Sequence, residues 1–359
     1  KSSAAQMCIR DSLCCCLLLP AERIPAMIYG CGIFSKYVFL LRSVLSLLLA
    51  KGWGESQSVK FQFMDIRFKH FVITMFNLKL WAKDKHSAPT HTSDWLERRF
   101  ELFEMYCLPS VRQQSTKNFI WLCLFDADTP EVFRERIHGY EREIPQFRPF
   151  FFTEAEAADF LCSDEIRRSR FIRRTVAECL TAEDEYVLTT NLDNDDALHR
   201  DAIATLQRYF TGNPQETLYS LNYGMQYFVA WKLPMKMRYP HNHFLTLAER
   251  TDKDFHTIEY YGHTIARKLL PTVDIFERPY WMEVVHGCNV SNELRITSRI
   301  GYSFYYRSLS LADFGLPDRL SWKTNCVNNL FRLPTYFCKV AVWRLMRKWQ
   351  RRKKRKNGC

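Results

Sequence analysis

A run of seven consecutive apolar residues at 119–125 constrains the fold of this 359-residue chain more than any other feature. A strand that is apolar at every position must be covered on both faces, as in the parallel sheets of α/β proteins. Thr129, Pro130 and Glu131 follow, and they supply a cap and an early proline that are typical of a helix start. The run therefore predicts a strand between two layers of helices.

Strand and helix patterns alternate along the chain after residue 64. Strands are predicted at 71–78, 186–190, 217–223, 226–233 and 281–286, and helices at 154–180 and 200–210. This alternation predicts an α/β fold with an open, mostly parallel sheet flanked by helices. Sheets of this kind bind their ligands beyond the carboxyl ends of the strands.

A further helix is predicted from Asp94 until Pro109 stops it. Asp94 would cap this helix, with Glu97 three residues on. Apolar residues then recur at spacings of four, three and four, namely Leu96, Phe100, Phe103 and Cys107. The spacing predicts an amphipathic helix that packs on the sheet.

The strongest chemical signal is the acidic run at 191–196, directly after the strand predicted at 186–190. Mg²⁺ and Mn²⁺ prefer oxygen ligands and usually take one or two protein carboxylates, leaving their other positions to water and phosphate. Asp193 and Asp195 alternate on an extended backbone and would supply that arrangement. The ion would neutralise a diphosphate as it leaves a sugar donor.

Three other interpretations of the acidic run stay open. Asp195 or Asp196 precedes Ala197 and Leu198 and would cap a helix there. A calcium loop of the EF type is disfavoured, because Leu198 stands where its sixth position requires glycine. The third interpretation is a solvated surface loop.

A second polar group ends the strand predicted at 281–286. His286 stands there beside Gly287. His286 would complete a metal shell or bond a diphosphate, and Gly287 would let the backbone approach a ligand. The alternative is a histidine whose hydrogen bonds are only structural.

These segments together resemble the rhamnosyltransferases of bacteria, a family of GT-A-like glycosyltransferases (nucleotide-diphospho-sugar transferases) of surface polysaccharide assembly. The acidic run with its flanks is the more specific part of the resemblance, which extends over residues 68–302. The matching segments are 70–77, 95–113, 119–126, 190–198 and 281–292.

The resemblance implies transfer of a sugar, with rhamnose resting on the family label, from a nucleoside-diphosphate donor to a glycan or lipid-linked acceptor. It implies that Asp193 and Asp195 bind Mn²⁺ or Mg²⁺ and the donor diphosphate, and that His286 faces the same site. The transfer would invert the sugar and would need a general base within hydrogen-bond reach of the acceptor hydroxyl. Candidates for this base are Glu283, Asp274 and Asp196.

The donor nucleotide and diphosphate would meet further residues by the same resemblance. Thr74 and Asn77 would lie near the nucleotide. Asn191 stands where we expect a basic residue that helps to hold the diphosphate. Arg173 or Arg174, on the preceding helix, would substitute for that residue.

The formal net charge of +12 comes mainly from the C-terminal tail. Ten Lys and Arg lie between Lys339 and Lys356, interleaved at first with apolar residues, and the rest of the chain is nearly neutral. Such a segment suits an anionic membrane surface, where each Lys or Arg contributes roughly 1 kcal/mol. A solvated terminus is an equal alternative. Nucleic acid is the least favoured partner, because nothing else in the chain supplies an aromatic RNA platform or a recognition helix.

The chain divides into three segments by sequence. Residues 1–63 are expected to be a translation artefact or a non-native extension, 64–315 the glycosyltransferase domain, and 316–359 a helical, strongly basic tail. The apolar stretch 24–50 contains Lys36 and Arg42, each costing roughly 2.5–3.5 kcal/mol in mid-bilayer. Thirteen cysteines without a CxxC pair favour a reducing cytoplasm, with peripheral contact at the inner membrane face.

Two other functions compete with sugar transfer. One is another metal-dependent nucleotide-processing enzyme, such as a nucleotidyltransferase or phosphohydrolase, although the chain has no glycine-rich phosphate loop. The other is a catalytically silent protein that binds a membrane or nucleic acid through the basic tail. Metal-dependent cleavage of a nucleotide sugar separates sugar transfer from silent binding.

Overall fold

A computed structural model describes residues 66–80, 89–162, 165–286, 311–316 and 322–332, together with single positions as far as Trp349. The predicted N-terminal extension at 1–63, Gly287 and much of the basic tail lie outside the described residues. Within the described part of the chain, no helix combines the length and the apolar character that crossing a bilayer requires.

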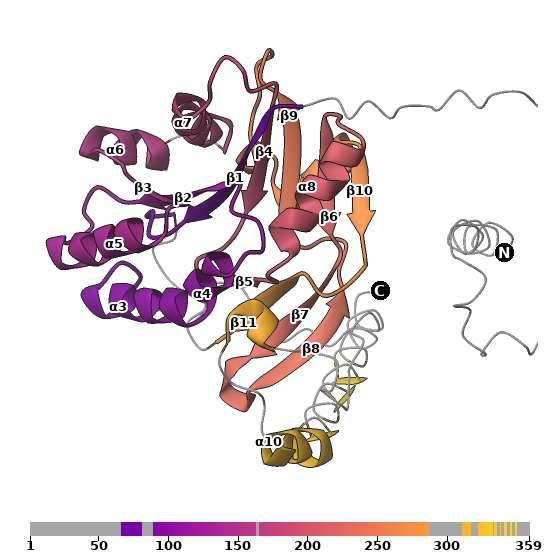
Figure 1. Cartoon of the computed structure of the whole chain (residues 1–359). Coiled ribbons are helices and arrows are strands. Elements are labelled where there is room, and N and C mark those ends of the chain that lie inside the picture. Colours follow the sequence, from indigo (N-terminus) through magenta and orange to yellow (C-terminus); the bar gives the residue numbers. More distant parts are fainter. Residues whose placement is uncertain are drawn as a thin grey trace, which may run out of the picture. The chain divides into compact units, whose positions relative to one another are not determined.

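A seven-stranded sheet forms the centre of the described structure, with strands in the order β10-β6-β9-β4-β1-β2-β3 (Figure 1). Strands β3, β2, β1 and β4 are parallel, β9 runs antiparallel between β4 and β6, and β10 is parallel to β6. The predicted α/β class with an open, mostly parallel sheet is confirmed. The strands are β1 (Phe68–Met75), β2 (Ile120–Phe125), β3 (Phe147–Phe151), β4 (Tyr186–Asn191), β6 (Thr217–Leu221), β9 (Leu245–Arg250) and β10 (Thr272–Ile275).

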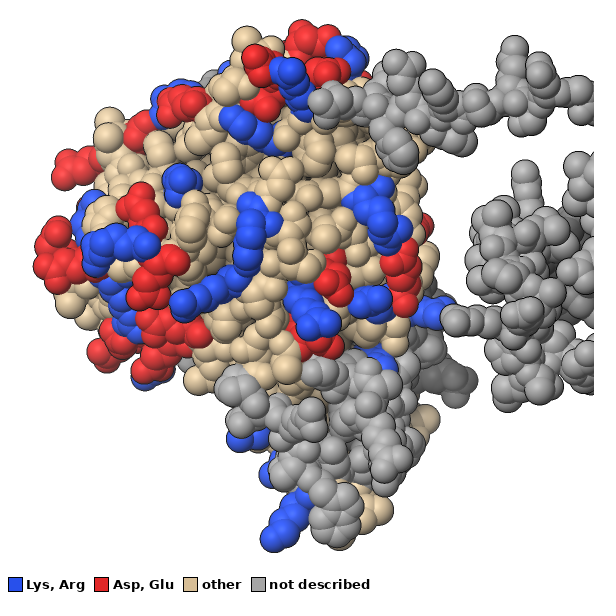
Figure 2. Space-filling model, in the orientation of Figure 1, with Lys and Arg blue, Asp and Glu red and all other residues tan. Residues whose placement is uncertain are grey.

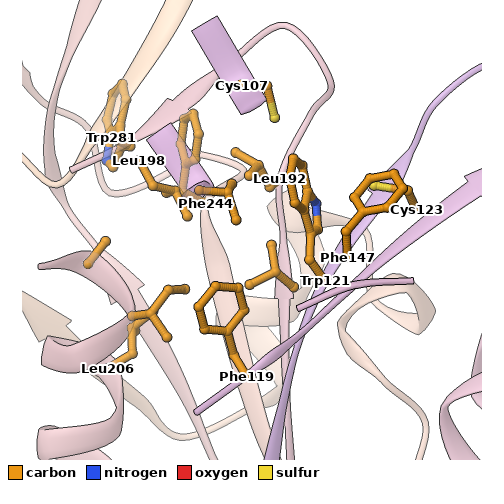
Figure 3. Packing of buried hydrophobic residues seen from close by; sticks show 14 of the residues in the cluster. Cys107, Phe119, Trp121, Cys123, Phe147, Leu192, Leu198, Leu206, Phe244 and Trp281 are labelled. Carbon is orange, nitrogen blue, oxygen red and sulfur yellow. The ribbon is translucent and has the colours of Figure 1, made fainter. Parts of the chain in front are cut away.

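Helices cover both faces of the central sheet. Successive side chains of a strand point to opposite faces, so neighbouring residues of one strand pack against different helices. Val72 belongs to a cluster with α3 (Ser93–Leu102), α5 (Glu131–Glu143) and α8 (Ala202–Gly212). Its neighbour Phe71 belongs to a second cluster, with residues of α6 (Glu154–Cys162) and α7 (Glu165–Glu178). The first cluster is rich in aromatic rings (Figure 3). Two of them are Trp121 and Phe147, whose ring centroids are 5.2 Å apart.

A second, four-stranded sheet lies next to the carboxyl-end region of the first. Its order is β5-β11-β7-β8, with β11 antiparallel to β5 and parallel to β7, and with β8 antiparallel to β7. These strands are β5 (Ala197–Leu198), β7 (Tyr223–Phe228), β8 (Leu233–Arg238) and β11 (Trp281–Val285). Because β5 follows the acidic run and pairs with β11, the small sheet fixes that run against the end of β4.

The helix predicted from Asp94 forms, with two corrections. Thr92 caps α3 in place of Asp94, since its Oγ1 accepts a hydrogen bond from the amide of Trp95 at 3.2 Å. Pro109 does not stop the helical path, which continues through a π-helical turn (Phe103–Cys107) into α4 (Leu108–Arg112). Proline is tolerated there because it lies in the first turn of α4, where its missing N–H is not needed. The four apolar residues of the predicted spacing are buried.

The strand predictions are right for β1, β2, β4, β6 and β11 within a few residues, and wrong elsewhere. The segment predicted as one strand at 226–233 contains the end of β7, a 3-10 turn (Val229–Trp231) and the first residue of β8. Strands β3, β9 and β10 were not predicted. Strand β3 contains Arg148 and Pro149, which an edge strand tolerates because one side of its backbone has no partner.

The surface of the sheet domain carries mixed charge on the face shown in Figure 2. Lys and Arg alternate with Asp and Glu over the helices there, without a field of one sign. Arg136, for example, pairs with Glu97 at 2.9 Å and with Glu104 at 2.6 Å. This face therefore lacks the basic stripe that nucleic-acid binding requires.

Candidate active site

A cavity of about 440 Å³ opens beside the carboxyl end of β4. Asn191 and Asp193 line it from the end of β4, and Glu283 lines it from β11. The segment 239–245, which leads into β9, and the segment 258–263, which follows β9, complete the wall. Because β9 is antiparallel to β4, the segment that precedes β9 lies at the carboxyl end of β4.

Asp193, Asp196 and His243 form one group at this cavity. Nε2 of His243 lies 2.8 Å from Oδ2 of Asp196 and 3.6 Å from Oδ2 of Asp193. Asp193 is half-exposed, whereas Asp196 is fully buried and also accepts a hydrogen bond at Oδ1 from the amide of Val284 at 2.8 Å. Burial alone would lower the pKa of His243, but Asp193 and Asp196 outweigh it and raise this pKa to about 10. Without a metal ion, the two carboxylates therefore favour the protonated form of His243; binding a metal would require His243 to give up that proton.

Asp195 faces a different set of partners. Its Oδ2 accepts from Nη1 of Arg99 at 3.0 Å and lies 2.8 Å from Nε2 of His286. Arg99 also donates to Oδ1 of Asn194, whose own amide nitrogen donates to the carbonyl of Phe76 at 2.6 Å. Burial would raise the pKa of Asp195, but Arg99 and His286 hold it well below its ordinary value. Asp195 is thus a buried anion tied to α3 and to the end of β11.

Two glutamates also line the cavity. Glu283 is 3% exposed, and its Oε2 accepts a hydrogen bond from Nε2 of Gln226 at 2.8 Å. Glu259 is partly buried, and its Oε1 is shielded from water without a hydrogen-bond partner among the described residues. Burial, and then the charge of Asp193, raise the pKa of Glu259 to about 7. The two glutamates therefore differ in their hydrogen bonds: the Glu283 carboxylate accepts one from Gln226, whereas Oε1 of Glu259 accepts none from a described residue.

The capping and surface-loop interpretations of the acidic run are wrong. Ala197 and Leu198 form β5 and do not begin a helix, so neither Asp195 nor Asp196 caps one there. The next helix, α8, begins four residues later. Asn194, Asp195 and Asp196 are 2%, 6% and 0% exposed, which excludes a solvated loop.

Thr74 and Asn77, expected near the nucleotide, make bonds within the fold and do not line the cavity. Thr74 is fully buried and accepts a hydrogen bond from Nε1 of Trp121 at 3.0 Å. Asn77 donates to Oγ1 of Thr129 at 3.1 Å and accepts from the amide of Asp126 at 3.0 Å. Both side chains connect β1 to the end of β2 and the turn after it. A role in nucleotide binding stays a prediction for them.

Three charged residues that were predicted at the site do not line the cavity. Arg173 and Arg174 were predicted to hold the diphosphate, and Asp274 was predicted as a general base. Arg173 pairs with Asp254, and Arg174 pairs with Glu156. Asp274, on the edge strand β10, pairs with Arg267 at 2.8 Å. None of these three predicted residues lines the cavity, whereas Asn191 does, and its Nδ2 donates to the carbonyl of His243 at 3.3 Å.

The donor chemistry of the group at Asp193 fits a divalent cation. One atom each of Asp193, Asp196 and His243 lie within 4.8 Å of one another. Carboxylate oxygens suit Mg²⁺ and Mn²⁺, while imidazole suits transition metals, so the mixed set fits Mn²⁺ better than Mg²⁺. Of the ligands predicted from sequence, this group contains Asp193. Metal binding by Asp195 and His286 stays a prediction.

Three site residues escaped the sequence analysis: Arg99, His243 and Glu259. A signal existed for His243, because two histidines and an asparagine occur within the five residues 239–243. Arg99 lies one residue before the buried Phe100 in a predicted helix, and its sequence position does not show that it faces the acidic run. Glu259 lies in a short 3-10 turn (Ile258–Tyr260) without a sequence pattern of its own.

Comparisons with solved structures give matches at low identity and low TM-score. Staphylococcus aureus TarS 1-349 in complex with UDP is 11% identical, with 61% of each chain covered and a TM-score of 0.35. Mouse xyloside xylosyltransferase 1 is 12% identical over 44% of this chain and 52% of that one, with a TM-score of 0.26. A Desulfovibrio desulfuricans G20 protein, described as a "putative nucleotide-diphospho-sugar transferase", is 6% identical over 60% and 80%, with a TM-score of 0.31.

These matches are partial, and no curated protein matches the chain. The chain spans about 60% of the length of the S. aureus TarS 1-349 structure. A family model with the description "Putative rhamnosyl transferase" matches residues 65–298. Its range includes the whole seven-stranded sheet, all four strands of the small sheet and every residue that lines the cavity. The family predicted from sequence is confirmed: the chain belongs to the family described as "Putative rhamnosyl transferase".

Proposed function

We propose that this chain is a glycosyltransferase that moves a sugar from a nucleoside-diphosphate donor to a hydroxyl of a glycan or lipid-linked acceptor, with metal assistance and inversion. The observation that carries the proposal is the cavity at the carboxyl end of β4, with Asp193 and His243 on its wall and Asp196 bonded to His243. Ligands of α/β sheets bind at such strand ends. Rhamnose as the donor sugar rests on the family description.

The size and lining of the cavity suit a nucleotide sugar. Its volume of about 440 Å³ falls within the range of roughly 300–1,000 Å³ that is typical of small-molecule sites. Tyr239 and Tyr261 supply partly exposed aromatic surface, while Asn191 supplies an amide group. Aromatic walls with a few polar groups provide contact area and fix the orientation of a ligand.

Asp193, Asp196 and His243 would hold Mn²⁺ in this proposal. A bound divalent ion neutralises the charge that develops on a departing diphosphate. Asp193 is the member of the group that is open to the cavity, since half of its side chain is exposed. Asp196 and His243 are held in place by each other and by the amide of Val284.

Inversion requires a general base that receives the proton of the acceptor hydroxyl, and the candidates predicted from sequence are carboxylates. Of the three bases predicted from sequence, Glu283 lines the cavity, Asp274 lies outside it, and Asp196 has both oxygens bonded within the protein. Glu259 is a further carboxylate on the cavity wall. The base in this proposal is therefore a glutamate of the cavity wall.

The experiment that tests the proposal measures release of nucleoside diphosphate by the full chain from a panel of UDP-, GDP- and dTDP-sugars. Assays contain Mn²⁺ or EDTA, with a bacterial glycan extract as the acceptor. We expect release that requires Mn²⁺, is lost in Asp193→Asn and is retained in Asp274→Asn, the matched control outside the cavity. Release of nucleoside monophosphate instead would favour another nucleotide-processing enzyme. A folded protein that binds and cleaves no donor would contradict the proposal.

The C-terminal tail would bring the site to a lipid-linked acceptor at an anionic membrane. Its described apolar side chains are exposed, including Leu330 and Leu345, both at 67%, and Trp349 at 63%. The neighbouring Lys and Arg would attract anionic headgroups. Co-sedimentation with phosphatidylserine vesicles should be lost at high salt and in a Leu345→Glu/Trp349→Glu variant. Equal binding to neutral phosphatidylcholine vesicles would contradict this role.

A further inference from the structure

The loop that carries Glu259 is held by three consecutive backbone hydrogen bonds to side chains. The amides of His256 and Thr257 donate to the two carboxylate oxygens of Glu249, each at 2.9 Å. The amide of Ile258 donates to Oγ1 of Thr189 in β4, also at 2.9 Å. The 3-10 turn that contains Glu259 begins at Ile258. Strands β4 and β9 thus fix the chain directly before Glu259.

The same loop contains backbone strain. Thr257 has φ of 72° and ψ of 160°, although it is a β-branched residue, and its side chain is fully buried. Non-glycine residues in such regions cost on the order of 1–3 kcal/mol and persist where surrounding bonds determine the conformation. The bonds from Glu249 and Thr189 do so here. The strain and the bonds together place residue 259 in one position on the cavity wall.

The carboxylate placed there differs from the other acids of the site. Its Oε1 is shielded from water and has no hydrogen-bond partner among the described residues. A buried polar atom without a partner costs roughly 1–3 kcal/mol, and more when it is charged. Glu283, by contrast, accepts from Gln226, and Asp195 and Asp196 each bond to a histidine. Glu259 therefore lines the cavity with a carboxylate whose Oε1 is not engaged by any described group.

We propose that Glu259 is the general base of the sugar transfer, an assignment that rests on the proposed function. The acceptor oxygen forms a bond to the anomeric carbon as its proton passes to the Glu259 carboxylate. The bond from that carbon to the diphosphate oxygen breaks, and its electron pair leaves with the nucleoside diphosphate. Water takes the place of the acceptor hydroxyl when no glycan is present, and the proton then comes from water.

Burial raises the pKa of Glu259 above its ordinary value, which suits this task. A base is most effective when its pKa lies near the working pH. The opposite case is Asp195, whose pKa is held low by Arg99 and His286. Asp195 is therefore a weak proton acceptor despite its place in the acidic run.

The test compares Glu259→Gln with wild type in the full chain, using the donor-sugar panel with Mn²⁺. Donor binding is measured by calorimetry, and catalysis by release of nucleoside diphosphate. We expect Glu259→Gln to bind the donor with unchanged affinity and to lose about 10²–10⁴-fold in rate. Glu259→Asp, which keeps the carboxylate, should recover part of that rate. Glu216→Gln is the matched control, because Glu216 is exposed, lies outside the cavity and pairs with Lys253.

Two results would overturn the assignment while the proposed function stands. Glu259→Gln with a wild-type rate would exclude Glu259 as the base. Loss of donor affinity in step with the loss of rate would make it a donor-binding residue. A different failure, in which wild type itself neither binds nor cleaves any donor, would remove the proposed function and the assignment together.

Discussion

Asp195 and Glu259 are two carboxylates of the same site that the protein treats in opposite ways. Asp195 is 6% exposed and bonds to Arg99 and His286, whereas Oε1 of Glu259 is shielded from water without a partner among the described residues. Burying a charge is costly unless cations and hydrogen bonds compensate it. Asp195, whose charge is compensated, connects α3, the acidic run and the end of β11. The uncompensated carboxylate keeps its affinity for a proton.

The difference teaches that an acidic run is a poor guide to which acid has the highest affinity for a proton. Asp195 and Asp196 have the most conspicuous sequence positions, yet their oxygens serve bonds within the protein. Glu259 has an inconspicuous position, yet it lines the cavity. The following variants test this contrast by their effects on stability, from the largest to the smallest.

Asp195→Ala should cause the largest loss of stability. It removes the partner of Arg99, whose side chain is 11% exposed, so a cation stays buried without an anion. Breaking a buried pair in this way costs roughly 3–5 kcal/mol in the free energy of unfolding. Urea unfolding measures the loss, with Asp128→Ala at an exposed ion pair as the control. Replacing Arg99 by Met in the same chain should restore part of the loss. A loss below about 1 kcal/mol would show that Asp195 is not compensated as described.

Glu249→Gln should have an intermediate effect that acts on the loop before Glu259. Gln has one oxygen where Glu249 offers two, so the amide of His256 or Thr257 loses its acceptor. An unsatisfied buried donor costs roughly 1–3 kcal/mol. Because the loop positions Glu259, the transfer rate should fall while donor affinity is kept. Thermal unfolding and donor calorimetry measure the two effects, and an unchanged rate would show that the loop does not position the carboxylate.

Glu259→Gln should change how stability depends on pH. The pKa of Glu259 is raised from 4.5 in the unfolded reference to about 7 in the fold. Its protonated form therefore stabilises the fold below pH 4.5, and that contribution is lost as the pH rises through 7. With screening of the partly exposed side chain, the loss is roughly 1 kcal/mol. Unfolding in EDTA between pH 5 and 8 should show a smaller loss in Glu259→Gln than in wild type. Parallel curves would mean that Glu259 does not titrate in this range.

Asp193→Asn should have the smallest effect on stability and a complete effect on donor cleavage. Half of the Asp193 side chain is exposed and it lies 3.6 Å from His243, so its replacement should lower the free energy of unfolding by less than about 1 kcal/mol. In wild type, Mn²⁺ should raise the melting temperature, because an ion that binds the folded state stabilises it. The variant should lose that shift. A full Mn²⁺ shift in Asp193→Asn would place the ion elsewhere.

The parts of the fold that were predicted from sequence have local signals. Strand β2 is apolar throughout because it lies inside the sheet, and β4 ends where the acidic run begins. Strand β9 was missed although it is central, because its pattern within Leu245–Arg250 ends in Glu249 and Arg250. Strand β9 runs antiparallel to β4 and β6. This direction depends on pairing between segments far apart in the chain, and the residues of β9 alone do not indicate it.

The site residues divide in the same way, into those with a local sequence signal and those without one. Asp193 and Glu283 were predicted, since each lies at a strand where ligands of α/β sheets bind. Their neighbours come from far along the chain: His243 precedes β9, and Glu259 follows it. Arg99 comes from α3, 96 residues before its partner Asp195. A single sequence does not show which of these distant groups meet.

The sequence by itself determined the α/β class, the acidic run at the end of β4 and the resemblance to a family that the family model supports. Periodicity and residue type are sufficient for these, because they reflect burial and chemistry within a few residues of chain. Only the tertiary structure decided which carboxylates are neutralised and which one is left without a partner. That outcome depends on Arg99 of α3 and His286 at the end of β11, which reach Asp195, and on a strained loop that carries Glu259 on the cavity wall.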